Sequence, residues 1–305
     1  MPWFIISLVG PFFWSISNHI DKILLHKHLK GIGKEALVLY STFFGILVLP
    51  FALYFDSTIF KIGSFNIFIL VTAGFISSVG IYLYLCALEK DEASTVIPFF
   101  QMIPVFGFAL GYIFLQETLS MSQVLACLII ILGAVVISLE INELKQIQIK
   151  RNLLFLMASS SFYYALYETL FKFGTNINSF WVSTFWQYVG LLIFGLIIFF
   201  SSYRYRTDFI FLVKIHNWRL LTINLFNEGI TVLGNTAYNF ALLLAPIAIV
   251  MTINGYQPIF VFIQGIVLTL LFPKLVSEKL SKKHLIHKIS AIVIVFLGSY
   301  MLYNS

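Results

Sequence analysis

Long apolar stretches recur along the whole chain, and each is close to the length that a helix needs to cross a lipid bilayer. One stretch, residues 128–137, contains no polar side chain. Such a run lacks the alternation between lipid-facing and lumen-facing residues that the strands of a membrane barrel require. The chain is therefore predicted to be an all-α, polytopic membrane protein with about ten transmembrane helices.

The composition supports this fold class. Of the 305 residues, 60% are apolar and only 10% are charged. A soluble domain carries roughly 25% charged residues, because water must solvate its surface. Lipid is therefore expected to surround most of this chain. The predicted spans are 3–22, 35–55, 66–88, 93–116, 119–139, 152–173, 179–201, 219–243, 246–272 and 287–303.

The net charge of +6 comes mainly from basic clusters between the predicted spans. Clusters beside membrane helices meet anionic lipid and set the orientation of the protein, so the expected partners are membrane lipids and not nucleic acid. The odd-numbered connections hold most of the Lys and Arg residues, which predicts that both termini lie outside the cytoplasm.

One pattern occurs in both halves of the sequence. The segment Leu-Gln-Glu-Thr-Leu-Ser at 115–120 follows the fourth predicted span, and Val-Ser-Glu-Lys-Leu-Ser at 276–281 follows the ninth. The next span contains a Leu-Gly pair in each half, ending at Gly133 and at Gly298. The shared order of these features indicates an internal duplication.

We infer two repeats of about five helices each, 1–140 and 151–305, with a connecting loop at 141–150. Because each repeat has an odd number of spans, the second copy must enter the membrane from the opposite side. The prediction is an inverted repeat, which is typical of secondary transporters with a site near the middle of the bilayer.

The segment from Ala93-Ser-Thr-Val-Ile-Pro98 to Gly133, together with the polar helix end at 14–22, resembles the EamA branch of the drug/metabolite transporter superfamily. The resemblance implies ten helices, secondary transport of metabolites and cytoplasmic termini, although the Lys and Arg distribution predicts external ones. The second half departs from the family pattern at 271–276, where the connection is longer.

Glu228 is the strongest candidate for a functional residue, because it lies near the middle of a predicted span. A charged group in hydrocarbon costs about 2.5–3.5 kcal/mol, so it usually faces a cavity or a partner. Asn224, Asn235 and Asn239 share its helix face, and Tyr238 lies beside them. This polar stripe is predicted to line water or substrate, with a purely structural hydrogen bond as the alternative.

Glu168 is the second acidic candidate, in an aromatic stretch that includes Tyr164. Lys172 follows it by four residues, which predicts an ion pair within one helix. In the first span, Asn18 is a further candidate. We expect its neighbours His19 and Asp21 to lie at a solvated helix end.

Matching prolines mark the fourth and ninth spans, at Pro104 and Pro258. A proline in a membrane helix removes a backbone hydrogen bond and frees a carbonyl group that can meet a solute, or it serves only as a packing kink. Gln101, Asn254 and Gln257 lie beside these prolines and are predicted to face the same binding region.

The sequence predicts a secondary transporter that moves a small metabolite by alternating access, as an exporter of an amino acid or a related solute. No nucleotide-binding motif is present, so an ion gradient (with H⁺ as the candidate ion) or exchange would supply the energy. An aromatic cage beside Glu168 or Glu228 favours the alternative, an importer or exchanger of an organic cation such as a quaternary amine.

A membrane enzyme that modifies lipids is the alternative from another class. It lacks support, because the sequence shows neither a His-Glu-x-x-His nor a Gly-x-Ser-x-Gly motif, and we predict no enzyme, cofactor or metal. The Ile, Lys and Phe content suggests an AT-rich, bacterial genome, so we predict a location in a bacterial cytoplasmic membrane. The sequence does not set the oligomeric state.

Overall fold

The computed structural model describes residues 2–23, 34–89, 96–138, 151–214, 218–271 and 282–304. The predicted loop at 141–150 and the second copy of the repeated turn, 276–281, lie outside these residues. All regular secondary structure in the described part of the chain is helical, which confirms the all-α prediction.

In the first half the helices are α1 (Pro2–Ile23), α2 (Lys34–Phe44), α3 (Val48–Phe55), α4 (Ser64–Leu88), α6 (Ile103–Leu115) and α7 (Met121–Ser138). In the second half they are α8 (Arg151–Thr175), α9 (Phe180–Ser201), α10 (Tyr203–Lys214), α11 (Trp218–Leu242), α12 (Ile247–Thr252), α13 (Gln257–Leu271) and α14 (Lys282–Tyr303). Three short 3-10 segments join α2 to α3, precede α6, and join α12 to α13: η2 (Gly45–Leu47), η3 (Ile97–Met102) and η4 (Ile253–Tyr256).

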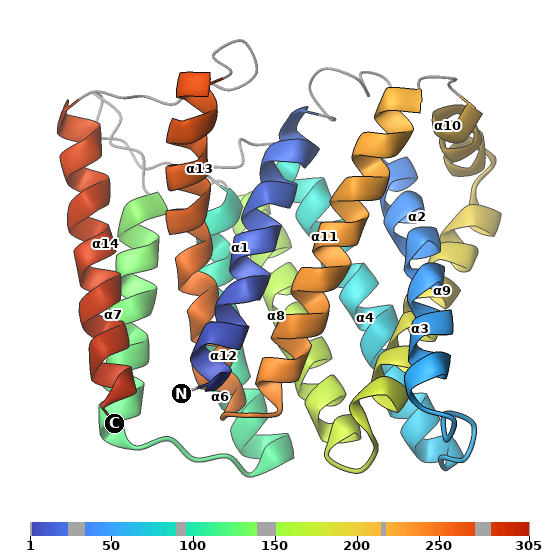
Figure 1. The fold of residues 1–305 in the computed structure, drawn as a ribbon, viewed down its shortest axis with the longest axis horizontal. Coiled ribbons are helices and arrows are strands. Elements are labelled where there is room, and N and C mark those ends of the chain that lie inside the picture. The colour runs from blue at the N-terminus through green and yellow to red at the C-terminus, as the bar shows by residue number, and fades with distance from the viewer. Residues whose placement is uncertain are drawn as a thin grey trace.

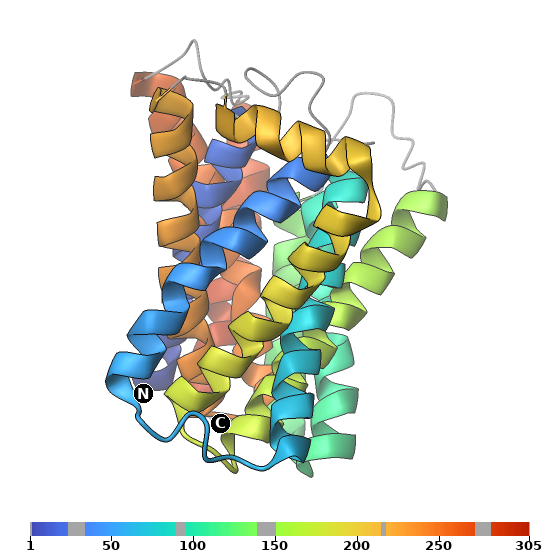
Figure 2. The ribbon, with the colours of Figure 1, turned by 90° about the vertical axis from the view of Figure 1, so that its right-hand side faces the viewer.

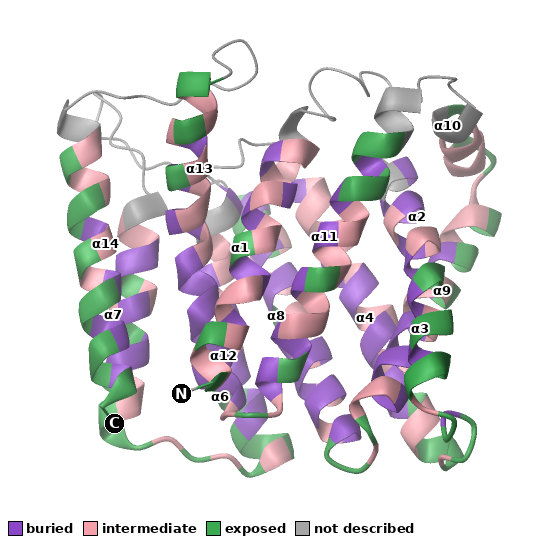
Figure 3. Cartoon of the chain, in the orientation of Figure 1, coloured by how far each residue is buried: buried purple, intermediate pink, exposed green. Residues whose placement is uncertain are grey.

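Five helices in the described ranges are long and apolar enough to cross a membrane. They are Val38–Phe55, Ser64–Leu88, Phe180–Ser201, Ile247–Leu271 and Leu285–Tyr303, and Phe99–Leu115 and Met121–Val136 are shorter apolar helices. Exposed residues run along the outer sides of α3 and α14, among them Phe51, Tyr54 and Phe296 (Figure 3). An apolar outer surface of this kind suits lipid, so the chain is an integral membrane protein.

Helix α10 occupies a segment that the sequence analysis treated as a connection. Arg204, Arg206 and Asp208 make this segment too polar for a membrane span. The helix lies across one end of the bundle instead of running through it (Figure 2). The sequence did not predict α10, because a short polar helix lacks the long apolar run of a membrane span.

The two termini lie at the same end of the helical bundle (Figure 1). α1 runs away from that end, whereas α8, the first helix of the second half, starts at the opposite end and runs back (Figures 1 and 2). α1 packs against α11, α4 against α8, and α7 against α14. Each of these pairs joins the two halves of the chain.

α4 and α9 approach each other so closely that glycine is required on both helices. A Cβ atom on Gly74 would lie 1.8 Å from the carbonyl oxygen of Gln187, and one on Gly190 would lie 2.0 Å from that of Val71. α2 and α11, in contrast, contact each other at only a few described positions. The bundle is therefore closed between α4 and α9 and more open between α2 and α11.

The first copy of the repeated turn, 115–120, ends one helix and starts the next. Gln116 adopts a left-handed conformation with φ of 55°, which stops α6. Ser120 and Gln123 then form a capping box: the Gln123 amide donates to Ser120 Oγ at 3.2 Å, and the Ser120 amide donates to Gln123 Oε1 at 3.0 Å. This turn fixes the position of Glu117 between the two helices.

Candidate functional site

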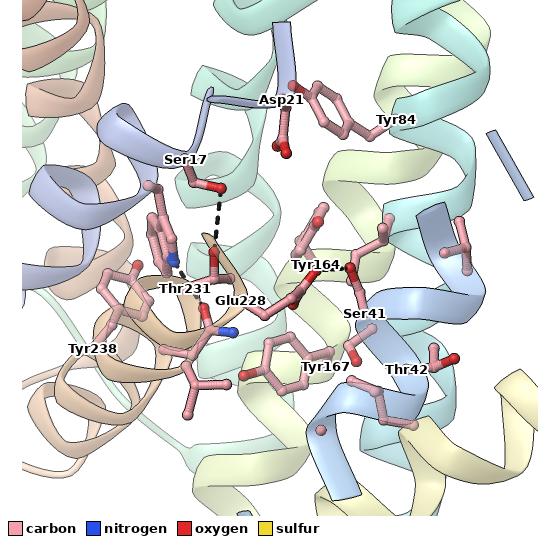
Figure 4. Close-up of a pocket in the computed structure, with 18 of the residues that line it drawn as sticks. Ser17, Asp21, Ser41, Thr42, Tyr84, Tyr164, Tyr167, Glu228, Thr231 and Tyr238 are labelled. Carbon is pink, nitrogen blue, oxygen red and sulfur yellow. Dashed lines mark hydrogen bonds between the residues drawn. The ribbon is translucent and has the colours of Figure 1, made fainter. Parts of the chain in front are cut away.

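A cavity of about 240 Å³ lies among α1, α2, α4, α8, α9 and α11 (Figure 4). Three carboxylates line it: Asp21, Glu168 and Glu228. Among the residues that the structure describes, no Lys, Arg or His lines the cavity. A cavity with this lining holds three acidic groups and no described basic side chain to pair with them.

Glu228 belongs to a polar cluster that joins three helices. The Ser41 hydroxyl of α2 donates a hydrogen bond to the Glu228 carboxylate of α11 (Figure 4). Asn227, the preceding residue, donates from Nδ2 to Asp21 Oδ1 of α1 at 2.7 Å. Thr231, one turn further along α11, donates to Ser17 Oγ of α1 at 3.2 Å.

The position of Asp21 corrects the expectation of a solvated helix end. Asp21 lines the cavity, close enough to Glu228 for electrostatic interaction, because α11 packs along this end of α1. His19 also differs from the expectation: it is buried, and its Nε2 lies 3.1 Å from the carbonyl oxygen of Val261 on α13. The sequence could not show which helix covers this end of α1.

Glu168 is buried among tyrosines. Its side chain is only 4% exposed, and Oε2 has no hydrogen-bond partner among the described residues. The Tyr238 hydroxyl lies within hydrogen-bonding reach of the carboxylate, and Tyr164 and Tyr167 are close enough to interact with it electrostatically. Glu168 therefore offers a free carboxylate oxygen in aromatic surroundings.

The predicted ion pair between Glu168 and Lys172 is wrong. Lys172 Nζ lies 2.6 Å from Glu117 Oε1 and donates to the carbonyl oxygen of Ala245 at 2.6 Å. The i,i+4 spacing allows a local pair, but tertiary packing brings a carboxylate from the α6–α7 connection to the lysine instead. Glu168 is consequently not paired with a basic side chain among the described residues.

Aromatic rings make up much of the remaining wall. Trp14 Nε1 donates to Asn235 Oδ1 at 2.8 Å, and the Trp14 ring lies with its centroid 5.0 Å from that of Tyr238. These contacts join α1 to α11. The aromatic side chains that line the cavity are Trp14, Tyr84, Phe100, Tyr164, Tyr167, Tyr188 and Tyr238.

A triangle of buried hydrogen bonds joins α8, α9 and α11 at one side of the cavity. The Tyr167 hydroxyl donates to Asn239 Oδ1 at 2.8 Å and accepts from Gln187 Nε2 at 3.2 Å. Asn239 Nδ2 donates to Gln187 Oε1 at 3.3 Å. Because all three side chains are satisfied within the triangle, they hold these helices together.

The two prolines occupy matching places, because each is the second residue of a helix that follows a 3-10 segment. Pro104 lies in α6 after η3, and Pro258 lies in α13 after η4. Asn254 in η4 and Gln257 at the start of α13 line the cavity. Gln101 in η3 is buried but is absent from the cavity lining.

Comparison with known proteins identifies the first half of the chain, since residues 1–139 match the model of the EamA-like transporter family. This half belongs to the EamA-like transporter family. The match confirms the resemblance seen in the sequence motifs, and the family is part of the drug/metabolite transporter superfamily. Members of the EamA-like family are transporters and not enzymes.

No curated protein matches the chain. A solved structure, reported under the words "Crystal structure of protein", has a TM-score of 0.70 and 10% sequence identity to this chain. The likeness covers 98% of this chain and 96% of the other. At this identity it shows the fold alone, and that fold extends beyond the EamA-like half.

The cavity brings together all but one of the side chains predicted for binding, with Gln101 as the exception. The EamA-like half contributes Asn18. The second half contributes Tyr164, Glu168, Asn224, Glu228, Asn235, Tyr238, Asn254 and Gln257. Their roles in binding remain a prediction.

Ser41 and Tyr84 are among the residues of the EamA-like half that line the cavity and that sequence reasoning missed. Ser41 is a polar residue within an apolar span, and that signal could have found it. Tyr84 carries no comparable signal, because the chain has 15 tyrosines and a ring beside lipid looks the same in sequence.

Proposed function

We propose that the protein is a secondary transporter for a small organic cation, such as an amine or a quaternary ammonium compound. The observation that carries the proposal is the acidic lining of the cavity, which contains three carboxyl groups and no described basic side chain. Carboxylates held away from water favour a positively charged partner. The aromatic wall adds cation–π attraction, about 0.5–2 kcal/mol per contact with an ammonium group.

The sequence favours amino acid export over transport of an organic cation, whereas the acidic lining of the cavity favours the organic cation. An amino acid carries a carboxylate in addition to its ammonium group. In this cavity the carboxylate of an amino acid would face the carboxyl groups of Asp21, Glu168 and Glu228. The hydrogen-bond donors available to it would be amides such as that of Asn18. Like charges in a low-dielectric site repel strongly, so a solute with positive charge alone fits better.

The proposed mechanism is alternating access between two inverted repeats, 1–140 and 151–305. The opposite directions of α1 and α8 support the inversion (Figures 1 and 2). Under that symmetry, the pair formed by α4 and α9 corresponds to the pair formed by α11 and α2. One pair is tightly packed and the other is not, which is the asymmetry expected of a state open toward one side. Exchanging the two packings would open the other side.

The proposal includes coupling to an ion gradient, with H⁺ as the ion, and a place in a bacterial cytoplasmic membrane. A chain without a nucleotide-binding motif needs a gradient or a counter-solute as its energy source. The acidic cavity supplies groups that can hold a proton or a cation in turn.

Counterflow in proteoliposomes tests the solute class. Vesicles that contain purified protein and unlabelled solute at about 10 mM are diluted into labelled solute. Accumulation of the label inside the vesicles is then followed over time. The panel compares tetramethylammonium and methylammonium with neutral amino acids and a dicarboxylate, and protein-free vesicles give the background. Counterflow of the ammonium compounds alone is expected. Counterflow of amino acids without ammonium compounds would overturn the cation proposal and restore amino acid transport.

A further inference from the structure

Glu228 and Asp21 line the same cavity, and each accepts a hydrogen bond from a neighbouring side chain. Ser41 and Asn227 donate hydrogen bonds to them, and the two carboxylates are close enough to interact. The Asn227 side chain also carries a buried Oδ1 atom, which has no hydrogen-bond partner among the described residues. The titratable groups that face this pair from the other helices are Tyr40 of α2, Tyr84 of α4 and Tyr188 of α9.

Glu168 has a separate set of neighbours. The groups that interact with its carboxylate are Tyr164, Tyr167 and Tyr238, and the Trp14 ring lies against Tyr238. Its Oε2 atom is buried and has no hydrogen-bond partner in the part of the chain that the structure describes. A carboxylate oxygen surrounded by ring faces suits an alkylated ammonium group, which needs charge neutralisation and apolar contact at once.

We propose that Glu168 binds the ammonium group of the solute, whereas the Asp21–Glu228 pair carries the proton that is exchanged for it. This assignment rests on the proposed function. Two carboxylates that interact within one low-dielectric cavity do not both remain ionised without cost, so one of them readily holds a proton. Glu228 and Asp21 each accept a hydrogen bond from a neighbouring hydroxyl or amide group, which suits a carboxyl group that changes its protonation state. Glu168 Oε2, in contrast, has no hydrogen-bond partner among the described residues and is open to a ligand.

Because both sites line one cavity, of about 240 Å³, occupancy of one affects the other. A cation at Glu168 and a proton on the pair repel through a low-dielectric space, so the arrival of one favours release of the other. The proton leaves from Glu228 or Asp21 to the water of the open side. One solute cation moving in one direction is thus exchanged for one proton moving in the other.

The test compares Glu168→Gln with Glu228→Gln in proteoliposomes, with tetramethylammonium as the probe. Two readouts separate the sites: solute–solute counterflow, which requires no proton, and accumulation driven by an imposed pH gradient. Glu228→Gln is expected to keep counterflow and lose gradient-driven accumulation. Glu168→Gln is expected to lose both, with affinity for tetramethylammonium in a calorimeter reduced at least about tenfold.

Folding is checked separately, by monodisperse elution of each variant and by Glu168→Asp, which keeps the charge and should restore part of the binding. The opposite pattern, with binding lost in Glu228→Gln and kept in Glu168→Gln, would overturn the assignment. Loss of both activities in both folded variants would also overturn it, because one shared site would then serve solute and proton. If the wild-type protein carries no ammonium compound at all, the proposed function itself fails and the assignment falls with it.

Discussion

The ammonium group of Lys172 lies 2.6 Å from a carboxylate oxygen of Glu117, so a residue of α8 is joined to the connection between α6 and α7. The other Glu117 oxygen accepts a hydrogen bond from the Ile247 amide at 2.6 Å, at the start of α12. Lys172 also donates to the carbonyl oxygen of Ala245, just before α12. One ion pair therefore links the two halves at the end of the bundle that holds the termini.

Removing Lys172 should destabilise the protein strongly. Lys172→Met leaves Glu117 with an unbalanced charge in a largely buried place, and breaking a buried pair in this way costs about 3–5 kcal/mol. The measurement is the unfolding midpoint in detergent. The control is Arg204→Gln, which breaks an exposed 3.8 Å contact with Asp208 and should change stability by less than about 1 kcal/mol. Equal changes in stability for the two variants would mean that the ion pair between Lys172 and Glu117 does not stabilise the fold.

Alanine at Gly190 should disturb the packing of α4 against α9. The added Cβ would lie 2.0 Å from the carbonyl oxygen of Val71, so the helices must separate, at a cost of about 1–3 kcal/mol. Gly229→Ala is the matched control, because a Cβ there meets nothing within 4 Å and alanine favours a helix by about 0.5–1 kcal/mol. Opposite shifts of the two melting temperatures are expected. A Gly190→Ala variant that is as stable as the wild-type protein would contradict the close approach of α4 and α9.

Cross-linking α4 to α9 should stop transport without preventing binding. The rings of Phe75 and Phe194 have centroids 5.2 Å apart. Phe75→Cys and Phe194→Cys are combined in a background with Cys86→Ser and Cys127→Ser, and a short thiol cross-linker is applied. Because the proposed mechanism requires this packing to open, counterflow should fall at least about tenfold while calorimetric binding remains. The uncross-linked double variant is the control, and undiminished counterflow after cross-linking would contradict the mechanism.

Asp56 should stabilise the protein in a pH-dependent way. The Ser179 hydroxyl, and then the Thr58 hydroxyl and amide, donate to this carboxylate, which lowers the pKa of Asp56 below its ordinary value of 3.8. A lowered pKa means that the stabilisation is present above the unfolded pKa and is lost as pH falls through the folded one. Asp56→Asn should therefore melt below wild type near pH 6, and the two should converge below about pH 4. A difference that stays constant with pH would rule out this charge effect.

Helical periodicity was sufficient to predict one wall of the cavity. Asn224, Glu228, Asn235 and Asn239 lie on one face of any regular helix, and they do line the cavity together. The cost of polar groups in lipid also implied that this face is enclosed. Local geometry and solvation thus decided these positions, without knowledge of the neighbouring helices.

Long-range partners could not be predicted in the same way. The spacing of Glu168 and Lys172 favoured a local pair, but Lys172 binds Glu117, which is far away in sequence. Asp21 lies at a helix end in sequence, and only the packing of α11 along α1 brings it into the cavity. Sequence patterns indicate which face of a helix is buried, but they do not identify the helix that buries it.

Charge recognition in the cavity is the central claim, and an isosteric pair of ligands tests it most directly. Choline and 3,3-dimethylbutan-1-ol have nearly the same shape, but only choline carries a positive charge. Their affinities for the purified protein are measured by calorimetry under identical conditions. The account predicts that choline binds at least about tenfold more tightly, because the three carboxylates and the aromatic wall act on its charge. Equal affinities, or tighter binding of the neutral alcohol, would contradict it.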